Sequence, residues 1–266
     1  MREPNSHEIM LAGDWHGSGY QSHRVIQSAE KRGLDTIFQL GDFGIWRGDE
    51  RYLDTMQNNL ETRGMHLFFI DGNHENFNRL YGYPLNEEGV RPIRPNITHV
   101  PRGYTWEWYG IRFMGLGGAA SIDKSFRREG HDWWPEELLT DEDVAYAQSK
   151  GRVDVMFTHD SPASAPNSIT DDPVGQGDAG DYYGDDNLEI CTEHRKKLQE
   201  VTDVARPRYL YHGHYHQFMS YGYQHPGDEH DSYAVGLDEG GAMLGKHAIV
   251  MDFEVIIREL MFGAEG

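Results

Sequence analysis

The chain has 266 residues, of which 38% are hydrophobic and 26% charged, and its formal charge is −20. This apolar fraction excludes a disordered chain and predicts one large folded domain over residues 1–266. The negative charge disfavours duplex nucleic acid and anionic membranes as partners, although a local cationic site for one phosphate is still compatible with it.

The cysteine and histidine contents are both informative. A single cysteine, Cys191, cannot form an internal disulfide. The first residues lack the apolar core of a signal peptide, and no apolar run approaches transmembrane length. We therefore expect a soluble cytoplasmic protein, and the sequence predicts no particular oligomeric state. The 15 histidines matter because imidazole is the commonest metal ligand and titrates near neutral pH.

The first third of the chain alternates predicted strands and helices. Short apolar runs at 8–12, 35–40 and 66–70 are predicted as strands. Residues 23–33 and 49–63 are predicted as helices, each closed by a glycine. This alternation is typical of parallel strands joined by crossover helices.

The middle of the chain contains two further predicted strands. Residues 82–105 include four prolines, and we expect an irregular connection there. Residues 111–118 and 153–160 are predicted as strands. Residues 119–139 form a polar loop, and residues 140–150 a helix with Thr140 as its N-cap.

The last third begins with a long loop rich in Asp, Gly, Pro and Ser, at 161–186. Loops of this length are usually functional or mobile. The remaining predicted elements are a helix at 187–204 and strands at 209–216, 233–237, 247–253 and 254–260.

Polar side chains follow five of these strands at the point where each strand ends. They are Asp14 and His16, Asp42, Asn73 and His74, His159, and His214 and His216. Ligands of open α/β sheets bind beyond the carboxyl ends of the strands, so we expect these groups to meet. Imidazole and carboxylate donors suit Mn, Fe, Zn, Ni or Co. Without His74 the set has seven donors, which exceed the needs of one tetrahedral zinc and suit two metals that share a bridging carboxylate.

The same residues occur in five short motifs. GDWHG (13–17), GD (41–42), GNHE (72–75), THD (158–160) and GHYH (213–216) resemble the ordered motifs of the calcineurin-like metallophosphoesterase family. This resemblance implies a four-layer αββα sandwich of two mixed sheets flanked by helices, which agrees with the α/β alternation above. It also implies a small phosphoesterase of bacterial or phage type.

The resemblance implies a role for each motif residue. The first metal would be bound by Asp14, His16 and His216, the second by Asn73, His159 and His214, and Asp42 would bridge the two. His74 would be the catalytic histidine that binds the phosphate or protonates the leaving oxygen. The implied cofactors are two divalent transition-metal ions, with manganese expected and Fe, Zn, Ni or Co also compatible.

The second motif departs from that of the protein Ser/Thr phosphatases. GDFGIWRG places Ile45 where those enzymes have an aspartate that orients the catalytic histidine. Asp71, Glu75 or Asp171 could orient His74 instead, or no acid does so. The arginine of that motif also falls one place late, which argues against a true protein phosphatase.

We therefore expect a phosphodiesterase in which a metal-bound hydroxide attacks the phosphorus of a small diester. Cyclic nucleotides, including 2′,3′-cyclic ones, are the expected substrates. A phosphomonoesterase or protein phosphatase-like enzyme is the alternative, and a nuclease or an inactive metal-binding module is less favoured. Arg127 and Arg128 lie in a basic stretch and are candidate substrate-binding residues. The Trp133–Trp134 pair could pack in the core, which is favoured, or could stack on a base.

Overall fold

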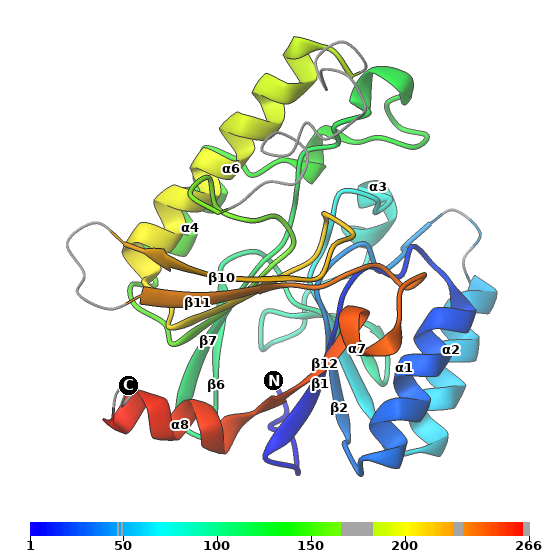
Figure 1. The fold of residues 1–266 in the computed structure, drawn as a ribbon. Helices are drawn as coiled ribbons and strands as arrows, with labels where there is room; N and C mark the ends of the chain where they lie inside the picture. The colour runs from blue at the N-terminus through cyan, green and yellow to red at the C-terminus, as the bar shows by residue number, and fades with distance from the viewer. Residues whose placement is uncertain (47, 49, 166–182, 226–230, 263–266) are drawn as a thin grey trace.

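Two six-stranded mixed sheets pack face to face, and helices cover their outer faces (Figure 1). This computed structural model describes residues 1–46, 48, 50–165, 183–225 and 231–262. The predicted four-layer sandwich of two mixed sheets is confirmed. The predicted loop at 161–186 lies mostly outside the described residues.

The first sheet has the strand order β12-β1-β2-β3-β5-β4. In that order the strands are Ala248–Asp252, Glu8–Ala12, Thr36–Gln39, His66–Phe69, Ile97–His99 and Arg91–Arg94. The four inner strands are parallel, and the two edge strands pair antiparallel to their neighbours. The carboxyl ends of β1, β2 and β3 therefore lie along one edge of the sheet.

The second sheet has the order β10-β11-β9-β8-β7-β6. Its strands are Met219–Gln224, Asp231–Gly236, Tyr209–His212, Val155–Thr158, Ile111–Leu116 and Tyr104–Trp108. Strands β11, β9, β8 and β7 run parallel, and β10 and β6 are antiparallel edges. The loops after β8 and β9 bring the histidine-bearing motifs toward the first sheet.

Three apolar layers hold the four structural layers together. Successive residues of a strand face opposite sides, so Leu11 packs between the sheets while Met10 packs under the helices. Helices α1 (Gly19–Lys31) and α2 (Glu50–Thr62) cover the first sheet. Helices α4 (Asp141–Gln148) and α6 (Asp185–Ala205) cover the second sheet. The layer between the sheets is aromatic, and Phe38 lies 4.3 Å from Phe157 between ring centroids.

The short helices lie in the connections. They are α3 (Phe77–Leu80), α7 (Leu244–His247) and the 3₁₀ turns η1 (Lys124–Phe126) and η2 (Pro135–Glu137). Helix α8 (Phe253–Phe262) follows β12 as the last element. The N-cap of helix α4 is Thr140, as predicted. Its hydroxyl accepts from the Asp143 N–H in a capping box. In the described part of the chain, no helix is long and apolar enough to cross a membrane.

Four predictions of local structure differ from the observed elements. Residues 82–105 are not irregular, because β4, β5 and the start of β6 lie there. Pro92 fits β4 because an edge strand tolerates a residue without an N–H donor. Residues 254–260 form helix α8 rather than a strand, and strand β10 was not predicted. Helix α1 starts before residue 23, because Ser18 caps it by accepting from the Gln21 N–H.

A buried ion pair joins Asp71, just after β3, to Arg102, in the connection between β5 and β6. Arg102 donates to Asp71 Oδ2 from Nε at 2.9 Å and from Nη2 at 2.7 Å. Its other donors reach the backbone carbonyls of Leu138 and Glu136 at 2.8 and 2.7 Å. Burial alone would raise the pKa of Asp71, but Arg102 and His99 hold it well below its usual value. Arg102 thus fixes the segment after β3 against the chain that precedes α4.

Replacing Arg102 tests this connection. Arg102→Ala leaves the Asp71 carboxylate buried and without its main partner, so we expect a loss of about 3–5 kcal/mol in the free energy of unfolding. The control is Arg94→Ala, which removes pairs with the exposed carboxylates of Glu50 and Asp54. That control should lose about 0–1 kcal/mol. Equal losses in urea titrations of the two variants would contradict the assignment.

Candidate metal centre

Four of the expected ligands converge on one point. Asp14, His16, Asp42 and His216 each offer a ligand atom, and these atoms lie within 4.8 Å of one another. His16 Nε2 lies 3.0 Å from His216 Nε2, which in turn lies 3.1 Å from Asp14 Oδ2. Atoms that all accept a cation and face each other at these distances form a donor set suited to a divalent metal.

Of the other three expected ligands, His159 and Asn73 lie next to each other and His159 contacts Asp42. His159 Nε2 lies 3.4 Å from Asp42 Oδ1 and 3.2 Å from Asn73 Oδ1. The ring of His214 lies beside that of His159, with 5.2 Å between centroids. Asp42 therefore stands between two groups of donors, where a bridging carboxylate would stand.

The backbone at these positions is strained. His16, Asp42, His214 and His216 all have positive φ angles, of 46°, 54°, 70° and 49°. A non-glycine residue in this region costs about 1–3 kcal/mol, and such strain concentrates at functional sites. Gly72 permits a close approach to one of them, because a Cβ there would lie 2.1 Å from Asp42 Oδ1.

The electrostatics of the cluster favour a bound cation. Asp14 and Asp42 are buried, and no lysine or arginine pairs with them among the described residues. Burial would lower the pKa of His159, but Asp42 and Asp14 raise it to about 10. Burial would also raise the pKa values of both aspartates, yet His159 and neighbouring histidines hold them below the usual value. Two buried carboxylates that draw a proton onto an imidazole fit a site for divalent metal ions.

His74 lies at the mouth of this cluster. Its backbone N–H donates to Asp42 Oδ1 at 2.8 Å, and its ring lies 4.8 Å from that of His16 between centroids. Arg127 Nη1 and Nη2 lie 3.3 and 3.0 Å from the two ring nitrogens. A neutral imidazole has one acceptor nitrogen, so only one of these contacts can be a hydrogen bond. Burial lowers the pKa of His74, Asp42 raises it and Arg127 lowers it further.

The fold and the motifs can now be compared with known proteins. The family model described as calcineurin-like phosphoesterase matches residues 7–218, well over half of the chain. The chain belongs to the calcineurin-like phosphoesterase family. Membership implies a hydrolase of phosphoric esters.

The chain is also similar to solved structures. The protein TT1561 of Thermus thermophilus superposes with a TM-score of 0.56 at 12% identity, covering 94% of this chain and 95% of that chain. At this identity the likeness shows the fold alone. A dimetal phosphatase from Danio rerio aligns with a TM-score of 0.47 at 13% identity, covering 88% and 87%. Comparison with curated protein sequences found no match.

The residues considered as acidic partners of His74 have other contacts in this phosphoesterase. Asp71 binds Arg102 and His99, as described above. Glu75 accepts the backbone N–H groups of Phe43, Gly44 and Ile45 at 2.7, 3.1 and 2.7 Å. Glu75 thereby holds the loop of the second motif, in which Ile45 is a buried core residue. Asp171 lies outside the described residues.

The remaining candidate residues are the two arginines, His212 and the tryptophan pair. Arg127 lies against His74, whereas Arg128 is exposed, and its described hydrogen bonds are made by its backbone with His131 and Asp132. His212 is buried and contacts the Tyr221 hydroxyl at 3.0 Å, away from the ligand group. Of the tryptophan pair, Trp134 packs in the core under the first sheet, whereas Trp133 is buried beneath Lys124, whose Nζ lies 4.6 Å from the ring centroid.

A hydrogen-bonded relay behind Asn73 was not predicted. Asn73 Nδ2 donates to Ser121 Oγ at 3.0 Å, and Ser121 Oγ donates to Glu137 Oε2 at 2.8 Å. Glu137 Oε1 also accepts the Ser121 N–H at 2.7 Å. The relay turns the carboxamide so that Asn73 Oδ1 faces His159 and the cluster. No sequence signal marks it, because Ser121 and Glu137 lie in the connection predicted only as a polar loop.

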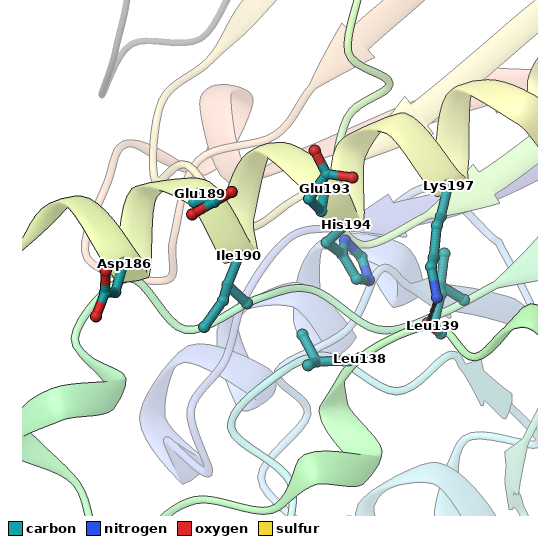
Figure 2. A pocket seen from close by; sticks show the side chains of 8 residues that line it. All are labelled: Leu138, Leu139, Asp186, Glu189, Ile190, Glu193, His194 and Lys197. Carbon is teal, nitrogen blue, oxygen red and sulfur yellow. Dashed lines mark hydrogen bonds between the residues drawn. The ribbon is translucent and has the colours of Figure 1, made fainter.

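Two cavities differ in the charge they offer to a phosphate. A cavity of about 460 Å³ lies under α6, with Leu138, Leu139 and Ile190 as its apolar lining (Figure 2). Asp186, Glu189 and Glu193 add carboxylates, and its Lys197 is already paired with Asp141 at 2.7 Å. A second cavity, of about 260 Å³, is lined by His74 and Arg127. The carboxylates of the first cavity repel an anion, whereas the second cavity places one guanidinium, that of Arg127, beside His74.

Removing the Ser121 hydroxyl tests the relay. In Ser121→Ala the Asn73 amide loses its acceptor and can rotate, so we expect metal affinity to fall by roughly 10–100-fold. The matched control is Ser22→Ala, which removes another buried hydroxyl, in α1, that donates to backbone carbonyls and to none of the proposed ligands. Calorimetric titration with Mn²⁺ measures both variants. Wild-type affinity in Ser121→Ala, with the fold intact, would contradict the relay.

Proposed function

We propose that the chain is a binuclear metal-dependent phosphodiesterase that hydrolyses small diesters such as cyclic nucleotides. The observation that carries this proposal is the meeting of Asp14, His16, Asp42 and His216 at one point, beside a second donor group around the same Asp42. Family membership supports phosphoester hydrolysis. The small cavity at His74 supports a small substrate.

The proposed ligands fall into two sets that share Asp42. One metal is held by Asp14, His16 and His216, and the other by Asn73, His159 and His214. Two bound divalent ions, proposed to be manganese, supply Lewis-acid activation of water and of the phosphoryl group. The protein holds the donors in place through strained loops and the Ser121 relay, so little reorganisation is needed on binding.

His74 and Arg127 are proposed to act on the substrate itself. Arg127 binds a non-bridging phosphoryl oxygen, since its guanidinium points at the mouth of the cluster. His74 donates a proton to the leaving oxygen. Burial and Arg127 lower the pKa of His74 in the free protein, whereas a bound phosphate anion favours its protonated form.

A phosphomonoesterase is the second candidate, and Arg127 is the observation that favours it. A guanidinium against His74 could neutralise part of a phosphate dianion. Among the described residues, however, Arg127 is the one cation in contact with His74. A single arginine is sufficient for the lower charge of a diester, and we favour the diesterase for this reason.

A substrate panel with Mn²⁺-loaded protein separates the two candidates. It contains cyclic nucleotides, nucleotide monoesters, a phosphopeptide and single-stranded DNA. We expect hydrolysis of the cyclic nucleotides to be fastest. Faster release of phosphate from the monoesters would contradict the diesterase and support the second candidate.

Loss of the bridging carboxylate should remove metal and activity together. In Asp42→Asn we expect hydrolysis of bis(4-nitrophenyl) phosphate to fall to the level of chelator-treated wild type, because the shared ligand is lost. Asp54→Asn, at an exposed position on α2, is the control and should keep both. Metal content and turnover are measured on the same samples. Undiminished turnover in Asp42→Asn or after chelation would overturn the metal-dependent mechanism.

The role of His74 predicts a dependence on the leaving group. His74→Gln should keep its metal but lose roughly 10²–10⁴ in turnover for a diester with an alkyl leaving group. The loss for a 4-nitrophenyl leaving group should be smaller, because that group departs without protonation. Steady-state kinetics on both esters measure the difference. The same loss on both, or none on either, would exclude a general-acid role.

A further inference from the structure

We propose that the 260 Å³ cavity beside His74 is a subsite for a flat, hydrogen-bonding ring, such as the nucleobase of a nucleotide ester. It is lined by Trp46, His74, Asn76, Arg127, His131, Asp132 and Trp134. Two of these residues, His74 and Arg127, are also at the mouth of the metal cluster. The inference rests on the proposed function, because the phosphate end of the same substrate would lie at those two residues.

Trp46 is an exposed indole held in a fixed place. Trp46 is 41% exposed and lies in the loop of the second motif, GDFGIWRG. The indole Nε1 donates to the His74 carbonyl at 2.7 Å. A Cβ built at Gly17 would lie 3.2 Å from the ring, so the ring also rests on the loop of the first motif. An aromatic ring that is held in place and partly exposed is suited to stacking on a base.

The polar groups of the cavity suit a neutral ring with donors and acceptors. Asn76 Oδ1 accepts from the Arg79 N–H at 3.1 Å, and the amide Nδ2 has no hydrogen-bond partner among the described residues. Asp132 adds an exposed carboxylate to the cavity that Arg127 also lines. Because the charges of Arg127 and Asp132 are opposite, the cavity offers little net attraction to a second phosphate group. An amide donor and a carboxylate acceptor complement the edge of a base.

The size of the cavity limits the occupant. Pockets for drug-sized ligands usually measure about 300–1,000 Å³, so 260 Å³ suits one ring system rather than an oligonucleotide. Arg127 is held by Asp123, whose Oδ1 lies 2.8 Å from Nε, so its guanidinium is a fixed boundary between subsite and metal cluster. A phosphoester with its phosphate at His74 can therefore place its base directly in the cavity.

The test compares ligands that share the phosphate and sugar and differ only in the base. AMP, CMP, ribose 5-phosphate and inorganic phosphate are titrated calorimetrically into Mn²⁺-loaded protein, with released phosphate monitored in parallel. Stacking predicts that a nucleotide binds roughly 5- to 150-fold more tightly than ribose 5-phosphate. A ratio near one for the wild-type protein would overturn the subsite and leave the phosphoesterase proposal standing. Absence of binding by every ligand, inorganic phosphate included, would overturn both.

Substitutions at Trp46 test whether this ring causes the difference in affinity between AMP and ribose 5-phosphate. Trp46→Leu should reduce the ratio between AMP and ribose 5-phosphate to near one, whereas Trp46→Phe keeps a flat ring and most of the ratio. The control is Tyr146→Leu, which removes an exposed aromatic on α4 that does not line the cavity. Unchanged discrimination in a folded Trp46→Leu variant would contradict the role of this ring. Should Trp46→Leu fail to fold, Trp46→Gln takes its place, and unchanged discrimination in that variant would contradict the role equally.

Discussion

Two buried carboxylates that share one small space set the main constraint on this structure. Asp14 and Asp42 are removed from solvent, and no arginine or lysine pairs with either among the described residues. Burying such charges without compensation is costly, so the site must acquire positive charge. The two carboxylates already raise the pKa of the adjacent His159 to about 10, against the effect of its burial. Divalent ions meet the same requirement and match the type and arrangement of the donors.

The rest of the fold can be understood as the support for that site. Parallel strands β1, β2 and β3 bring Asp14, Asp42 and Asn73 to one edge, and β8 and β9 bring their histidines from the second sheet. The aromatic layer between the sheets fixes the distance between these two edges. Glu75 then holds the loop after β2, and the Ser121–Glu137 relay orients Asn73. The loop that follows Asp42 and the carboxamide of Asn73 are thus restrained by neighbours outside the proposed ligand set.

Sequence reasoning was most successful where a local pattern carries the information. Apolar runs that end in Asp, Asn or His beside glycine predicted both the strands and the donors that follow them. It failed where tertiary packing decides. Pro92 lies in an edge strand that tolerates it, and the β-branched run of α8 is helical because Phe253 and Ile256 share one buried face. Ser121 and Glu137 meet Asn73 only in the folded chain. The role proposed for Trp46 was likewise not predictable, because only the folded chain shows an indole that is both hydrogen-bonded and exposed.

The central claim is that two metals bind on either side of Asp42. It is tested most directly by a crystal structure of the Mn²⁺-loaded protein with anomalous scattering recorded at the manganese edge. The account predicts two peaks about 3.5–4 Å apart. One should lie among Asp14, His16 and His216, and the other among Asn73, His159 and His214. A single peak, or peaks that leave Asp42 outside the coordination sphere, would contradict it.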